Sequence, residues 1–257
     1  MLEIKNLCAG YGKYNVLRDV NLKVPKGKLI SVIGINGSGK STLLKSVAGI
    51  ITPFSGQVIV DSHNAKTLKQ AELSQKLAYL PQGRDLPDMT VEQFVLHGRF
   101  PYLGYPRRYS SGDYTVAKNA MEKMGVYSLR EKRLSYLSGG MRQKVYIAMA
   151  LCQDTDYILL DEPTTYLDIS HQIETMKLLR SLADEGKGVA TVMHDLALAF
   201  TFSHEIAVLH NDTIAYCDTP TALCKTDVVK EVFGVSIDYN KTENIYNYIL
   251  KKEHSRF

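Results

Sequence analysis

Short apolar runs separated by helix-like segments form the main pattern of this chain. Residues 29–33, 157–160 and 188–193 are β-rich and free of charge, which is typical of strands buried in a parallel sheet. Residues 1–5, 206–209 and 214–217 also favour strands, whereas residues 42–48 have helical character and end at Gly49. The mixture predicts an α/β fold.

The middle of the chain differs from both flanks. Residues 90–98 carry helix start and stop signals, and apolar residues at helical spacing lead up to Gly125. They are Val116, Ala117, Ala120, Met121 and Met124. Residues 100–106 predict an aromatic, proline-rich link between the helices of this region. We therefore predict one domain over residues 1–257, with a catalytic core at about 1–85 and 138–257 and an inserted helical subdomain at about 86–137.

A glycine-rich loop lies between the strand at 29–33 and the helix at 42–48. It comprises Gly34, Ile35, Asn36, Gly37, Ser38, Gly39, Lys40, Ser41 and Thr42. Glycines let such a loop turn tightly and aim its N–H groups inward, and the helix N-terminus adds a positive dipole end. We expect Lys40 to reach the β- and γ-phosphates of a nucleotide and Ser41 to contact Mg²⁺. A chance match in a surface turn is the alternative, but the strand and helix on either side favour the phosphate loop.

Two carboxylates follow the apolar run at 157–160. Parallel strands present ligand-binding residues at their C-terminal ends, so Asp161 is a candidate Mg²⁺ ligand. Glu162 points elsewhere and is the candidate general base that polarises an attacking water. Alone, the pair could be a solvated acidic turn; together with the loop it indicates nucleotide chemistry.

The run from Leu137 to Gly140 predicts a second anion site. Ser138 is a good N-cap, and the helix that follows has an apolar face, so Gly139 and Gly140 expose backbone N–H groups at a positive helix end. A glycine-rich start used only for capping is the alternative interpretation.

Composition limits the remaining function classes. The chain has 257 residues and a formal net charge of +4, and its basic residues are dispersed, so we expect no nucleic-acid partner. No stretch approaches the roughly 20 apolar residues of a membrane span, and the N-terminus lacks a signal-peptide pattern. The four cysteines have no metal-site spacing and are expected to be reduced thiols.

The chain resembles ABC ATPases in the order of three motifs. These are the phosphate loop, the run Leu137-Ser138-Gly139-Gly140, called the LSGG run, and the Asp161–Glu162 pair. The resemblance implies a P-loop NTPase fold with a RecA-like core sheet and flanking helices, an N-terminal antiparallel β subdomain and an inserted α-helical subdomain. It also implies a homodimer in the ATP-bound state, in which Ser138, Gly139 and Gly140 contact nucleotide held by the other copy. Met141 departs from the commonest form of the motif, which has glutamine there.

The same resemblance assigns further roles. Lys40, Gln82, Glu162 and His194 would be catalytic, with Gln82 also approaching Mg²⁺ and His194 contacting the γ-phosphate. Tyr11 would stack on adenine, although a core or surface tyrosine is a serious alternative. Asp168 belongs to a loop that touches the facing subunit. A lone histidine such as His194 is more often structural, and its place after a predicted strand favours the functional role.

Within this family, the chain resembles most the ATPase subunits of importers for iron-siderophores, haem and cobalamin. The narrower resemblance depends on residues 98–102, 161–174 and 232–235. This implies a separate integral-membrane permease dimer that docks near Gln82 and residues 84–109, and an extracytoplasmic solute-binding protein. The chain would then work as a peripheral protein on the cytoplasmic face of the membrane. Selectivity for the imported molecule would lie in the permease and the solute-binding protein.

Several alternatives remain. An exporter subunit shares the catalytic motifs, and a non-transport ABC ATPase would normally have tandem halves, a coiled-coil insertion or a basic footprint. A GTPase or nucleotide kinase has the same phosphate loop but is not expected to carry an LSGG run before Asp161 and Glu162. A silent interaction module conflicts with the intact Lys40, Asp161, Glu162 and His194.

Overall fold

A computed structural model describes residues 1–82, 87–165, 167–240, 242 and 245–249 of the chain. Within these residues the strands form three sheets, of four, six and two strands. No helix in the described part of the chain has the length and apolar character needed to cross a bilayer.

An antiparallel sheet is built from the N-terminal residues in the order β2-β1-β4-β5. Its strands are β1 (Leu2–Tyr11), β2 (Tyr14–Val24), β4 (Ser55–Val60) and β5 (His63–Asn64). This sheet confirms the antiparallel β subdomain that the resemblance implied. Its alternating side chains, such as Leu2 and Ile4, are buried on the face that covers the next layer.

The core sheet has the order β10-β9-β3-β8-β7-β6, with all neighbours parallel except β10. Its strands are β3 (Leu29–Ile33), β6 (Leu77–Leu80), β7 (Tyr157–Asp161), β8 (Gly188–Val192), β9 (Glu205–His210) and β10 (Thr213–Asp218). Every residue of β3, β7 and β8 is buried, as their apolar runs predicted. Parallel strands need both faces covered, which explains the lack of alternation.

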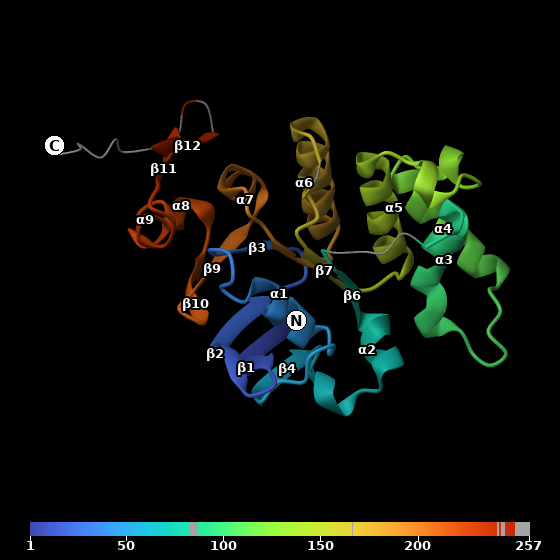
Figure 1. Ribbon diagram of the computed structural model, residues 1–257, viewed down its shortest axis with the longest axis horizontal. Helices are drawn as coiled ribbons and strands as arrows, with labels where there is room; N and C mark the ends of the chain where they lie inside the picture. Colours follow the sequence, from blue (N-terminus) through green and yellow to red (C-terminus); the bar gives the residue numbers. More distant parts are fainter. Residues whose placement is uncertain (83–86, 166, 241, 243–244, 250–257) are drawn as a thin grey trace.

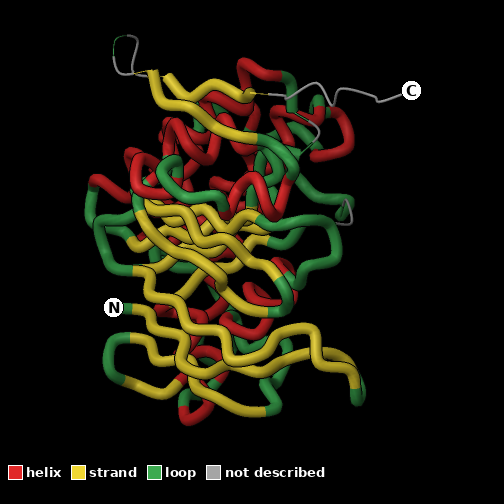
Figure 2. The backbone as a smooth tube through the Cα atoms, turned by 90° about the vertical axis from the view of Figure 1, so that its left-hand side faces the viewer, coloured by secondary structure: helices red, strands yellow, loops and turns green. Residues whose placement is uncertain are grey.

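Helices and the N-terminal sheet cover the two faces of the core sheet (Figure 1). The helices of the core are α1 (Lys40–Val47), α2 (Gln70–Lys76), α6 (Ile169–Asp184), α7 (Leu196–Phe202), α8 (Pro220–Leu223) and α9 (Val228–Phe233), with the short 3₁₀ helix η1 (Ala65–Thr67). Figure 2 shows the N-terminal sheet below the core sheet, and the hairpin of β11 (Ser236–Asn240) and β12 (Ile245–Ile249) at the opposite end.

The predicted helical insertion is helical in the structure. It holds α3 (Val91–Leu96), η2 (His97–Tyr102), α4 (Ser111–Lys123), η3 (Tyr127–Leu129) and η4 (Leu134–Tyr136). The helix α5 (Gly139–Cys152) follows it and packs against both α3 and α4. The predicted boundary near residues 85–86 lies outside the described residues.

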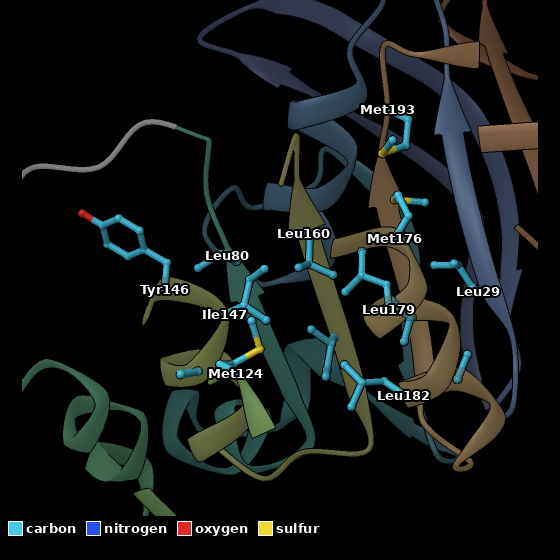
Figure 3. Close-up of a cluster of buried hydrophobic side chains, with 14 of the residues drawn as sticks. Leu29, Leu80, Met124, Tyr146, Ile147, Leu160, Met176, Leu179, Leu182 and Met193 are labelled. Atoms are coloured by element: carbon cyan, nitrogen blue, oxygen red, sulfur yellow. The ribbon is translucent and has the colours of Figure 1, made fainter. Parts of the chain in front are cut away.

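One hydrophobic core joins the insertion to the catalytic part. Side chains from β3, β7, α5 and α6 gather in it, among them Leu160, Ile147 and Leu179 (Figure 3). A second core lies between α1 and the N-terminal sheet. The strand ends are therefore held by packing on both sides, so the loops that follow them are carried on a rigid frame.

The link predicted over residues 100–106 does run between α3 and α4, but residues 100–102 belong to the 3₁₀ helix η2. Residues 97–102 form the 3₁₀ helix η2, because it is fastened to α5. A Cβ on Gly98 would lie 2.4 Å from the carbonyl oxygen of Met149, so only glycine allows this approach. The guanidinium of Arg99 bonds the carboxylate of Asp113 at 2.9 Å and the carbonyl of Cys152 at 3.2 Å.

Candidate nucleotide site

The phosphate loop connects the end of β3 to the start of α1, as the sequence predicted. Gly37 and Gly39 have φ of 80° and 99°, a left-handed conformation that costs glycine little. A Cβ on Gly34 would lie 2.5 Å from the carbonyl oxygen of Leu209, so the loop is also pressed against β9. The glycines thus meet steric needs that other residues could not.

Two polar side chains in this loop fit an anionic ligand. Lys40 is only 5% exposed, and its Nζ donates to the carbonyl oxygens of Gly34 and Ile35 at 2.9 Å each. Burial lowers the pKa of the Lys40 amine, while the charges of Glu162 and Asp161 act in the opposite direction. The buried Ser38 hydroxyl has no hydrogen-bond partner among the described residues. Phosphate oxygens would supply both the missing acceptor for Ser38 and a counter-charge for Lys40.

Asp161 stands at the end of β7, opposite the start of α1. The hydroxyl of Ser41 donates to its Oδ1 at 3.0 Å, and the hydroxyl of Tyr79 donates to its Oδ2 at 3.3 Å. Burial raises the pKa of Asp161, Glu162 adds to the effect, and the two hydrogen bonds oppose it. A carboxylate and a hydroxyl are oxygen donors of the kind that Mg²⁺ prefers, and a divalent cation there would favour the charged carboxylate. The donor set therefore fits the predicted metal.

Glu162 is the centre of a hydrogen-bond network. Its Oε1 bonds Nε2 of His194, and its Oε2 accepts from Nε2 of Gln82 and from the hydroxyl of Thr165, the latter at 3.0 Å. The carboxylate is 9% exposed, whereas His194 is 43% exposed. Glu162 also has a φ of 52°, a left-handed backbone conformation with a local cost of order 1–3 kcal/mol. Such strain persists only where surrounding contacts hold it.

Many of these groups face one cleft of about 410 Å³, although Asp161, Ser38 and Gly34 are not part of its lining. Its lining includes most of the residues that the sequence singled out, namely Tyr11, Asn36, Gly37, Gly39, Lys40, Ser41, Thr42, Gln82, Glu162 and His194, together with Val16. The Tyr11 ring is 51% exposed, and its hydroxyl lies 3.5 Å from that of Thr42. The stacking role of Tyr11 stays a prediction.

Ser138, Gly139, Gly140 and Asp168 lie outside the lining of this cleft. Ser138 is the predicted N-cap: its hydroxyl accepts from the backbone N–H of Met141 at 3.4 Å. Asp168 caps α6 by accepting from the N–H of His171 at 2.9 Å. Both residues are exposed, and the carboxylate of Asp168 also bonds Nδ1 of His171 at 2.8 Å.

Sequence reasoning missed two members of the site, Tyr79 and Thr165. Each holds one of the two acidic side chains, and each stands inside a run that the sequence already singled out for a different residue. Tyr79 precedes Gln82 by three positions, and Thr165 follows Glu162 by three. For Thr165, a hydroxyl three residues from a predicted carboxylate was the available signal. Tyr79 had none, because Asp161 is 82 positions away.

Residues 17–165 match the ABC transporter family. The chain belongs to the ABC transporter family. Its membership confirms the resemblance, and the protein is an ATPase of this family. It is 39% identical over 234 residues to the petrobactin import ATP-binding protein FpuD of Bacillus anthracis, a match covering 90% of this chain and 86% of that protein. It is also 40% identical over 233 residues to the achromobactin transport ATP-binding protein CbrD of Dickeya dadantii, covering 90% and 87%.

Solved structures confirm the predicted P-loop NTPase fold. A metal-chelate type ABC transporter in an inward-facing conformation matches with a TM-score of 0.83 and 25% identity, covering 98% of both chains. A dimeric ATP-binding cassette with bound ADP and phosphate, in a post-hydrolysis state, matches with a TM-score of 0.73 and 28% identity. That match covers 86% of this chain and 99% of the other.

Proposed function

We propose that this ABC ATPase powers an importer of iron-siderophore complexes. The observation that carries the proposal is the similarity over nine-tenths of the chain to ATP-binding proteins named for import or transport of petrobactin and achromobactin. Haem and cobalamin are alternative cargoes of the wider group that the sequence resembles. Residues 98–102 and the run 164–171 supported this group, although Tyr166 in that run lies outside the described residues.

In the proposed reaction, ATP occupies the cleft with its phosphates on the loop of residues 34–42. Lys40 would balance charge on the β- and γ-phosphates, and Ser41, Gln82 and Asp161 would hold Mg²⁺, which would neutralise charge developing during phosphoryl transfer. Glu162 accepts a proton from the attacking water, while His194 and Gln82 hold its carboxylate in place. Transfer of this kind depends mainly on positioning and electrostatics.

We place a second copy of the chain over this cleft. Ser138 and Asp168 are exposed and lie outside the cleft lining, so a partner that brings its own Ser138 helix end would add backbone donors to the phosphates. The similarity to a dimeric cassette with bound ADP and phosphate supports a dimer.

Mixed dimers test the shared site. Lys40→Ala and Ser138→Arg single variants should each be inactive, and mixing them should recover hydrolysis because some dimers then contain one intact pair. The matched control mixes wild-type protein with the Lys40→Ala/Ser138→Arg double variant, whose mixed dimers contain no intact pair. In that control only the wild-type homodimers should stay active. No recovery of hydrolysis when the two single variants are mixed would contradict the shared site.

The permease is proposed to dock on the aromatic surface formed by Phe100, Tyr102, Tyr105 and Tyr114, which are 41%, 37%, 100% and 48% exposed. Large apolar side chains gathered at a surface favour a protein partner. Residues 84–86 of the predicted docking region lie outside the described residues. A permease dimer, an extracytoplasmic solute-binding protein and a location on the cytoplasmic face of the membrane complete the proposal.

Uptake by a deletion strain tests the cargo. Cells lacking the gene should lose import of radioactive iron presented as a siderophore complex, and the wild-type gene should restore it while Glu162→Gln should not. Loss of haem or cobalamin uptake instead would refute the proposed cargo. A Tyr105→Asp variant should fail to restore uptake while its purified form hydrolyses ATP normally.

A further inference from the structure

Tyr79 connects two parts of the nucleotide site that are distant in sequence. It lies on β6, where it pairs in parallel register with Leu159 of β7. Paired residues of neighbouring strands point to the same face of a sheet, and so do residues two apart on one strand. Tyr79 and Asp161 therefore project from the same face, which places the phenol beside the carboxylate.

The Tyr79 ring and hydroxyl have separate environments. The ring packs against the buried cluster that contains Leu44, Val47 and Leu159, between the core sheet and α1. The hydroxyl extends beyond this cluster and donates to Oδ2 of Asp161 at 3.3 Å. Removing the oxygen alone would leave the apolar packing of the ring in place.

The two oxygens of Asp161 are held from opposite sides of the site. Ser41, at the start of α1, donates to Oδ1 at 3.0 Å, and Tyr79 donates to Oδ2 from β6. A carboxylate held at both oxygens has a fixed orientation, whereas one donor leaves it free to rotate about its terminal bond. Gln82, the other proposed metal ligand on this segment, follows Tyr79 by three residues.

We propose that Tyr79 is a positioning residue of the magnesium site, whose hydroxyl fixes the Asp161 carboxylate for the metal bound with ATP. The inference rests on the magnesium site proposed above. Groups that orient a metal ligand typically affect metal affinity or activity by about 10- to 100-fold. Because 3.3 Å is a long hydrogen bond, we expect an effect near about 10-fold, the lower end of this range.

A Tyr79→Phe variant of the full chain tests this role, with Mn²⁺ as the probe. Free Mn²⁺ is measured by electron paramagnetic resonance in the presence of ATP, and the dissociation constant should rise about 10-fold. ATP binding in EDTA, followed by a fluorescent analogue, should stay unchanged because Tyr79 is outside the cleft lining.

Tyr157→Phe is a matched control. Tyr157 stands at the other end of β7, is also a tyrosine bonded to an aspartate, and donates to Oδ1 of Asp61 at 2.6 Å. It should lower the temperature of unfolding and leave Mn²⁺ affinity unchanged. An equal loss of Mn²⁺ affinity in both variants would mean that any weakened strand has this effect and would overturn the proposal.

Two further outcomes would overturn it: unchanged Mn²⁺ affinity in Tyr79→Phe, or weaker binding of ATP in EDTA. An Asp161→Asn reference separates the possible failures. If Asp161→Asn does not weaken Mn²⁺ binding, the proposed magnesium site itself is wrong. If it weakens binding while Tyr79→Phe does not, only the role of Tyr79 is wrong.

Discussion

Replacing Thr165 by valine should slow ATP hydrolysis without weakening ATP binding. The change keeps the shape of the side chain and removes the hydroxyl that donates to Oε2 of Glu162 at 3.0 Å. A hydrogen bond to a charged group contributes about 1.5–3 kcal/mol, and about 1.4 kcal/mol is a factor of ten in rate. Because Gln82 and His194 still hold the carboxylate, we expect kcat to fall roughly 10- to 30-fold, within the range that one such bond allows.

The assay is steady-state phosphate release as a function of MgATP concentration. Thr165 is absent from the lining of the cleft, so KM should change less than about twofold, the signature of an interaction that matters mainly in the transition state. Thr165→Ser retains a hydroxyl and should recover most of the rate. An unchanged kcat in Thr165→Val, or a raised KM with an unchanged kcat, would refute the positioning role.

Three other changes should have distinct results. Glu162→Gln should retain ATP binding but hydrolyse about 10²- to 10⁴-fold more slowly, and near-normal single-turnover hydrolysis would contradict the general-base assignment. Asp113→Asn should reduce the free energy of unfolding by about 2–3 kcal/mol, because it leaves Arg99, which is only 12% exposed, without its charge partner. Hydrogen bonds from Ser110, with a smaller contribution from Arg99, hold the pKa of Asp113 below its usual value, and burial opposes them. The difference in unfolding free energy between wild type and Asp113→Asn, measured in urea, should therefore persist at neutral pH and shrink as the pH falls below about 4. Burial raises the pKa of the Cys152 thiol to about 12, whereas a hydrogen bond from the Asp19 backbone lowers the pKa of Cys8. Iodoacetamide at pH 8 should therefore label Cys8 before Cys152, as followed by mass spectrometry. Early labelling of Cys152 would contradict its burial.

The sequence predicted those parts of the site that depend on local chemistry. Glycines with positive φ, such as Gly37 and Gly39, stand where the tight loop between β3 and α1 requires them. Ser138 caps its helix as predicted, since capping involves only residues within one turn. The core strands were also predictable, because burial on both faces removes polar residues from them.

Contacts between distant segments could not be predicted in this way. Tyr79 and Asp161 are 82 positions apart, and their hydrogen bond depends on β6 and β7 being neighbours. The conformation of residues 97–102 was missed for a similar reason. The proline and aromatic content of residues 100–106 indicated a link, but the contact of Gly98 with α5 and the bonds of Arg99 hold residues 97–102 as a 3₁₀ helix.

The fastening of η2 to α5 has a mechanical consequence. Gly98 and Arg99 contact the C-terminal end of α5, while Ser138 caps its N-terminal end. A helix of 14 residues is roughly 20 Å long and resists bending. It can therefore move as a rigid body that couples the aromatic surface beside η2, at its C-terminal end, to Ser138 at its N-terminal end. A push on Phe100 or Tyr102 would move Ser138 relative to the phosphates of a facing molecule, without any change in the residues that perform the chemistry.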